Sequence, residues 1–156
     1  MSGIVEKKRH TYKEILITNK ARWIFYISKV YKGKAHDFSI VKKEFKPGGR
    51  WFEEYTVRLD LGFQGFKEAY RCAQVHIPHK RKRAKKGVDN SLTEDQKQYN
   101  AELGQERIFV EHSIGGMKRY RILVNRNRIK DFNLVNEIVG VCAGLWNFHL
   151  KCSESV

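Results

Sequence analysis

Residues 107–120 read RIFVEHSIGGMKRY and place a single carboxylate, Glu111, in a strongly basic segment. Arg107 stands four residues before it and Lys118 seven residues after it. At 3.6 residues per turn, this spacing puts the three side chains on one face of a helix, within roughly 40°. Two roles for Glu111 follow from this placement: an ion pair with Arg107, or a ligand for a divalent metal beside groups that hold phosphates.

The residues before this segment predict where its helix begins. Thr93 and Gln96 have the spacing of a capping box, and two acids between them suit the positive end of a helix dipole. Apolar residues then recur at helical period, at positions 99, 103, 110, 114 and 117. We therefore expect one long helix that carries both Arg107 and Glu111.

The rest of the chain alternates between strand and helix patterns. The predicted elements are a hairpin (10–19 and 22–31), a helix with apolar residues at 38, 41 and 45, a strand (55–63), a short helix (66–72), a brief strand at VHIP (75–78) and an apolar final helix (133–150). This order predicts an α/β fold with a mixed sheet, in one domain spanning residues 1–156. The final helix is interrupted by polar residues and is expected to be buried rather than to span a membrane, and all three tryptophans (Trp23, Trp51 and Trp146) are expected in the core.

The charge of the chain favours a polyanionic partner. Thirty-one Lys and Arg stand against 17 Asp and Glu in 156 residues, a net charge of +14. Nucleic acid is the first expectation and an anionic membrane surface the second. Within a predicted insertion loop at about 78–92, every residue from 80 to 86 except Ala84 is Lys or Arg. Three widely spaced cysteines without a CxxC indicate a reducing compartment, so we expect a cytoplasmic protein.

A second acid, Asp60, follows the predicted strand and precedes the glycine turn LGFQG. Open α/β sheets place their sites at the carboxyl ends of strands. A role in capping the turn is at least as good an explanation for this residue taken alone.

Several longer motifs carry a resemblance to a known family. DLGFQGF (60–66), IPHKRKRAKKG (77–87), LTEDQKQYNAEL (92–103) and ERIFVEHSIGGMKRYRIL (106–123) resemble the DDE transposases of bacterial insertion sequences and the related Harbinger-type transposases. The likeness includes KKRHTYK (7–13) and AHDFSIVKKEF (35–45) and runs to the C-terminus. It implies a ribonuclease-H-like fold, a mixed sheet flanked by helices, with an Asp, Asp, Glu triad that binds two Mg²⁺ ions, for which Mn²⁺ can substitute.

The resemblance assigns roles to residues of this chain. Asp60 matches the second Asp of the triad and Glu111 its Glu, so both are expected to be catalytic metal ligands. Arg107 and Lys118 match the family signature of Tyr, two residues, Arg, three residues, Glu, six residues, Lys; Gly104 stands where that signature has Tyr. The HD pair, residues 36–37, matches the start of the first helix of the family. His36 and Asp37 are expected to support the site, with Asp37 as the helix N-cap.

The resemblance also implies that the first Asp of the triad, and the strand that carries it, lie upstream of the KKRHT segment. We therefore expect a ribonuclease-H-like domain that lacks its first strand, from the C-terminal portion of a transposase and inactive alone. A decayed gene and the second frame of a frameshifted element both fit. A homodimer and association with an upstream transposase half are the two protein partnerships that this leaves open.

The expected partner is double-stranded DNA, both at the element ends and at the target. Its phosphates would be held by Arg107, Lys118, Arg119 and the loop residues Lys80, Arg81, Lys82 and Arg83. No membrane partner is expected. Two other functions stay open: a non-catalytic basic nucleic-acid-binding module, and a ribonuclease-H-like nuclease acting on RNA.

Overall fold

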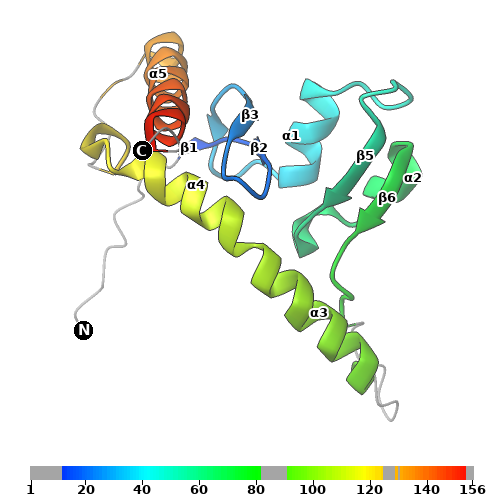
Figure 1. Cartoon of the computed structure of the whole chain (residues 1–156). Coiled ribbons are helices and arrows are strands. Elements are labelled where there is room, and N and C mark those ends of the chain that lie inside the picture. The colour runs from blue at the N-terminus through cyan, green and yellow to red at the C-terminus, as the bar shows by residue number, and fades with distance from the viewer. Residues whose placement is uncertain (1–11, 82–90, 125–128, 130, 154–156) are drawn as a thin grey trace, which may run out of the picture. The chain divides into compact units, whose positions relative to one another are not determined.

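A computed structural model of the chain describes residues 12–81, 91–124, 129 and 131–153 (Figure 1). It contains both helices and strands, as the α/β prediction requires. Contacts divide the chain into two compact units, which are described separately. Unit 1 comprises residues 1–35 and 113–156, and unit 2 comprises residues 36–112. Helix α4 (Ile108–Lys118) begins in unit 2 and ends in unit 1.

Unit 1 is built on short antiparallel strand pairs and one long helix. Its elements are β1 (Tyr12–Lys13), β2 (Leu16–Thr18), β3 (Ile24–Ile27), β4 (Tyr31–Lys32), the second half of α4, the 3-10 turn η2 (Arg121–Leu123) and α5 (Phe132–Ser153). β2 pairs with β3 and β1 pairs with β4, both antiparallel. The predicted hairpin is therefore confirmed. Its turn contains Arg22 with φ of 67°, a left-handed conformation that is uncommon outside glycine.

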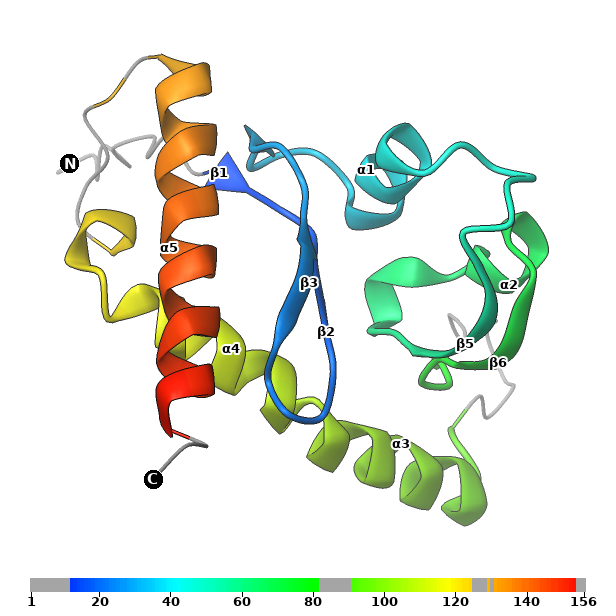
Figure 2. The same ribbon diagram turned by 45° about the horizontal axis from the view of Figure 1, so that its top comes forward.

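The core of unit 1 lies between α5 and the β2–β3 hairpin, which run side by side in Figure 2. One face of α5 buries six side chains: Val135, Val139, Cys142, Ala143, Trp146 and Leu150. They pack with Ile24, Val30 and Met117. The predicted final helix is thus confirmed, and burial of its apolar face is the main source of its stability.

Polar residues in this apolar helix have structural partners in the hairpin. The Asn147 side chain accepts from the Ile24 backbone N–H at 2.9 Å and donates to the Ile24 carbonyl at 2.8 Å, as a neighbouring strand would. Asn136 Oδ1 accepts from the Val30 N–H at 2.7 Å. The Trp146 indole N–H and the Ser113 hydroxyl both donate to the Arg22 carbonyl, at 3.0 and 2.9 Å. These bonds satisfy backbone groups that burial would otherwise leave unpaired.

Unit 2 combines a parallel strand pair with helices. Its elements are α1 (Asp37–Glu44), β5 (Phe52–Arg58), the 3-10 turn η1 (Leu61–Phe63), α2 (Phe66–Ala69), β6 (Cys72–His76), α3 (Glu94–Glu106) and the first half of α4. β5 and β6 are parallel and joined by η1 and α2. Aromatic rings fill the space between α1 and the strands: Phe66 lies 4.7 Å from Tyr70 and 5.3 Å from Phe52, measured between centroids.

The sheet differs from the prediction. The described strands form three separate pairs rather than one mixed sheet, so a ribonuclease-H-like sheet stays a prediction. In unit 1 a side chain takes the place of a ladder bond at the end of the β2–β3 pair: Ser28 Oγ, not a carbonyl, accepts from the Ile15 N–H at 2.8 Å. The predicted strand at 55–63 instead spans Phe52–Arg58, because Asp60 starts a turn.

Two further expectations need correction. The long helix is divided at Arg107 into α3 and α4, three residues after Gly104, a residue that lowers helix propensity. Trp51 is 51% exposed rather than buried, and its indole N–H donates to the Lys46 carbonyl at 3.0 Å. The capping box is confirmed, with both bonds between Thr93 and Gln96 present. None of the helices in the described residues is long and apolar enough to cross a bilayer.

Candidate metal and phosphate site

Asp60 caps the turn that follows its strand and also pairs with an arginine. It follows β5 and is the N-cap of η1, where its Oδ1 accepts from the Leu61 N–H at 2.8 Å. Its other oxygen, Oδ2, lies 3.1 Å from Arg107 Nη1. Capping fixes the direction of the carboxylate, and the second oxygen remains directed at a cation.

Glu111 lies in the first turn of α4 and contacts the same guanidinium. Its Oε1 is 3.4 Å from Arg107 Nη2. Arg107 therefore joins an acid from the strand end to an acid on the helix, within unit 2. Arg107 and Glu111 are exposed and Asp60 is partly so, and ion pairs of this kind contribute only about 0–1 kcal/mol each. Another cation in solution can compete for these oxygens.

Carboxylate oxygens are suitable ligands for a divalent cation, but two carboxylates are too few to hold one tightly. Mg²⁺ prefers oxygen ligands and takes six of them, some from water. Asp60 and Glu111 converge on one positive group, as ligands of a shared ion would. Within the described residues, however, no group of three His, Cys, Asp or Glu side chains could hold a metal. Two carboxylates alone bind Mg²⁺ weakly.

The turn that presents Asp60 packs against the start of α1. A Cβ added to Gly62 would lie 3.1 Å from Asp37 Oδ2, so a larger residue here would push that carboxylate aside by a few tenths of an ångström. Gly65 has φ of 88°, which also favours glycine. The expected capping role of Asp37 is wrong: the N-cap is His36, whose side chain makes no cap bond, and Asp37 is the first helical residue. A carboxylate in the first turn suits the helix dipole without capping.

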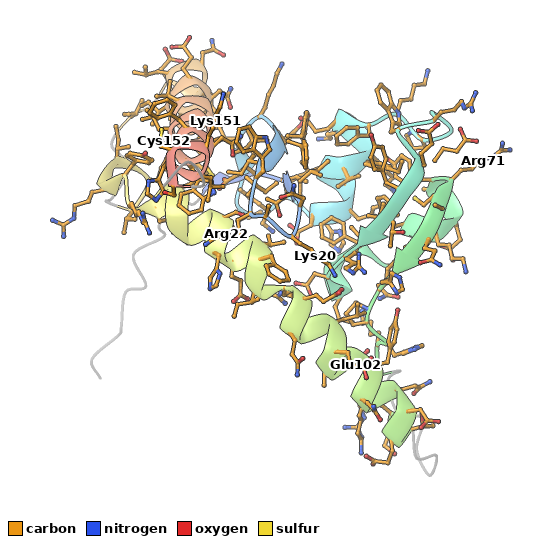
Figure 3. The ribbon with its side chains drawn as sticks, viewed as in Figure 1. Lys20, Arg22, Arg71, Glu102, Lys151 and Cys152 are labelled. Carbon is orange, nitrogen blue, oxygen red and sulfur yellow. The ribbon has the colours of Figure 1, made fainter. Side chains whose placement is uncertain are left out.

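A cleft that the sequence did not predict opens beside α3 in unit 2. Its volume is about 510 Å³, and it is lined by Arg58, His76, Tyr99, Glu102, Leu103, Gln105, Glu106 and Phe109. His76 Nδ1 and the Tyr99 hydroxyl are 3.1 Å apart across it, and Arg58 forms an ion pair with Glu106. Figure 3 labels Glu102 on this helix. The only sequence signal was Tyr99 within the apolar stripe of the predicted helix.

The structure divides the predicted phosphate-binding residues between the units. Lys80 and Arg81 are exposed in unit 2, while Lys82 and Arg83 lie outside the described residues. In unit 1, loss of water around the Glu14 carboxyl raises its pKa although the residue as a whole is exposed, and the charge of Lys118 opposes that shift.

Arg119, also in unit 1, is engaged with α5. Its Nη1 lies 3.1 Å from His149 Nε2 and its guanidinium lies 5.4 Å from the Trp146 ring. Because arginine only donates, His149 accepts at Nε2.

Comparison with known proteins identifies relatives. Residues 5–147 match the family described as DDE superfamily endonuclease. The chain is 33% identical over 144 residues to the probable transposase for insertion sequence element IS702 of Microchaete diplosiphon. That match covers 90% of this chain and 47% of the relative, so the chain spans about half the length of the curated relative it matches. No solved structure gives a significant match.

Proposed function

The chain belongs to the DDE superfamily endonucleases, and from this premise we propose that it carries part of the active site of a DNA transposase, which cleaves and joins DNA strands. Asp60 and Glu111 are its catalytic metal ligands. The observation that supports this proposal is their convergence, from a strand end and from a helix, on a single positive group.

We assign a role in such a site to each of three acidic residues. A bound Mg²⁺ or Mn²⁺ would activate the attacking oxygen and stabilise the leaving oxygen of the phosphodiester. Asp60 and Glu111 would hold the ion. The cap bond from the backbone N–H engages only Oδ1 of Asp60, and Oδ2, which now pairs with Arg107, would turn to the metal. Asp37, against Gly62, would support this turn.

Arg107 would change partner when a metal binds. In the structure its guanidinium neutralises both acids. A divalent cation held by Asp60 and Glu111 would repel the guanidinium, whose planar arrangement of donors suits a phosphate of the incoming DNA. Arg107 thus pairs with the two carboxylates in the absence of metal and binds a DNA phosphate when a metal is present.

We further propose that this chain alone does not cut DNA. Two-metal catalysis needs a carboxylate shared by both ions in addition to Asp60 and Glu111, and within the described residues no third ligand joins these two. For the isolated chain, the net charge of +14 favours the alternative function of a basic nucleic-acid-binding module. Its expected place is the cytoplasm, beside bacterial DNA.

Double-stranded DNA should bind this chain with a steep dependence on salt. If six or more phosphates are neutralised, log K should fall against log salt with a slope near −5 or steeper, because each neutralised phosphate contributes about −0.9. Filter binding on an unrelated duplex and on element ends would measure it, and a variant with Gln at every Lys and Arg of residues 80–86 serves as comparison.

A slope shallower than about −2 would contradict DNA binding by the basic surface. The same samples with Mg²⁺ or Mn²⁺ should show no strand cleavage. Robust cleavage that is lost in Asp60→Ala would show that another carboxylate of this chain completes the site.

A further inference from the structure

Helix α5 carries a second apolar stripe beside its buried face, with one member, Ile138, partly buried against the core. Leu134, Ile138, Val141, Leu145, Phe148 and Cys152 recur at alternating spacings of four and three residues, the repeat of a coiled-coil seam. Leu134, Val141, Leu145 and Phe148 are 44%, 60%, 44% and 65% exposed, and Cys152 is exposed as well. Four large apolar side chains in one line on a helix surface mark an interaction site.

The charge pattern of α5 supports this conclusion. In a chain of which 31% of the residues are charged, this 22-residue helix has one acid, Glu137, and one Lys or Arg, Lys151. A surface helix normally has a polar face opposite its buried stripe, and a helix that is apolar on both sides is usually covered on both. With a net charge of +14, two copies of the chain repel each other over most of their surface, but not along this stripe.

Glu137 and Lys151 also indicate which partner fits. Both flank the stripe on the same side, and each lies seven residues from Gly144, which is exposed with open space around it. If two copies of α5 pair antiparallel and cross at Gly144, Glu137 of each copy meets Lys151 of the other. Residues that flank the seam on the same side face each other in antiparallel helix pairs. Glycine at position 144 lets the two helix backbones approach closely where they cross. In a parallel pair the two copies of Glu137, and likewise of Lys151, would lie on opposite flanks of the seam, so these opposite charges would not meet.

We propose that two copies of this chain associate through the exposed stripe of α5, in an antiparallel pair crossing at Gly144. The layers of the seam are then Leu134 with Cys152, Ile138 with Phe148, and Val141 with Leu145, each repeated by symmetry. Figure 3 labels Lys151 and Cys152 near the C-terminal end of the helix. The pairing uses neither the carboxylates nor the basic loop, so it can be tested without DNA or metal.

A charge exchange tests the partner and the orientation together. In sedimentation equilibrium at low salt the full chain should dimerise, and Glu137→Lys and Lys151→Glu should each weaken the dimer by at least about tenfold, since each places like charges together twice. The double variant should return the affinity to within about threefold of the original. Ile122→Lys, at an apolar residue that is 51% exposed outside the stripe, should leave it unchanged.

Each other outcome would overturn the proposal. A monomer at tens of micromolar, with circular dichroism of a folded chain, would exclude self-association. A dimer that the double variant fails to restore would show that a different surface pairs, or that the stripe receives another protein. Rapid oxidation to a disulfide through Cys152 would indicate the parallel orientation, because the antiparallel pair holds these two thiols at opposite ends.

Discussion

Replacing Gly116 by alanine should lower the free energy of unfolding of the chain by roughly 1–3 kcal/mol. A Cβ at this position would lie 2.3 Å from Cε3 of Trp146, and two further indole atoms would be within 2.4 Å. Trp146 is only 4% exposed and its indole N–H is held by the Arg22 carbonyl, so the ring has little freedom to move. α4 must therefore shift away from α5, and packing in the core of unit 1 is lost.

Gly115 provides the matched control, one residue earlier in α4. A Cβ there meets nothing within 4 Å. Because alanine favours a helix over glycine by about 1 kcal/mol, Gly115→Ala should be neutral or stabilising. Urea denaturation followed by circular dichroism would compare the two variants. Equal stabilities would contradict the close packing of α4 on Trp146.

Arg107→Gln should raise the affinity of the isolated chain for Mn²⁺ by roughly three- to tenfold, while lowering its affinity for DNA. The guanidinium pairs with Asp60 and Glu111, and removing it leaves both carboxylates without that competing cation. Each exposed ion pair is worth up to about 1 kcal/mol, which sets the size of the gain. The same change removes a donor that a phosphate would use.

Arg81→Gln removes the same charge from another exposed site of unit 2 and is the control. It should weaken DNA binding but leave Mn²⁺ affinity close to that of the original chain. Calorimetric titration would measure the metal and filter binding the DNA. If both variants bind Mn²⁺ equally, the guanidinium does not compete for the metal site.

The elements with strong local signals could be predicted from the sequence. The capping box of Thr93 and Gln96, the periodic apolar residues of α5 and the turn between β2 and β3 depend on neighbouring residues, and all three are present. The strand pairing could not be predicted, because it depends on contacts between distant residues. The bond from the Ile15 N–H to Ser28 Oγ, which lies at the end of the β2–β3 ladder, has no local signature.

The candidate metal site could be predicted only in part, because it too depends on contacts between distant residues. The spacing of Arg107 and Glu111 on a helix allowed an ion pair as one of two roles for Glu111, and the structure contains that pair. That Asp60 shares the same guanidinium is a tertiary contact, which no spacing between residues 60 and 107 could reveal. Trp51 was assigned to the core by residue type, but its position beside a glycine turn leaves it exposed.

The most direct test of the central claim, that Asp60 and Glu111 are the metal ligands of this chain, is paramagnetic broadening by Mn²⁺ in amide NMR spectra. In the original chain, Mn²⁺ should first broaden the signals of residues 60–62 and 110–112. Asp60→Asn and Glu111→Gln keep the shape of each side chain but remove its charge, and each should abolish this broadening. Broadening that persists in both variants, or that begins elsewhere in the chain, would contradict the claim.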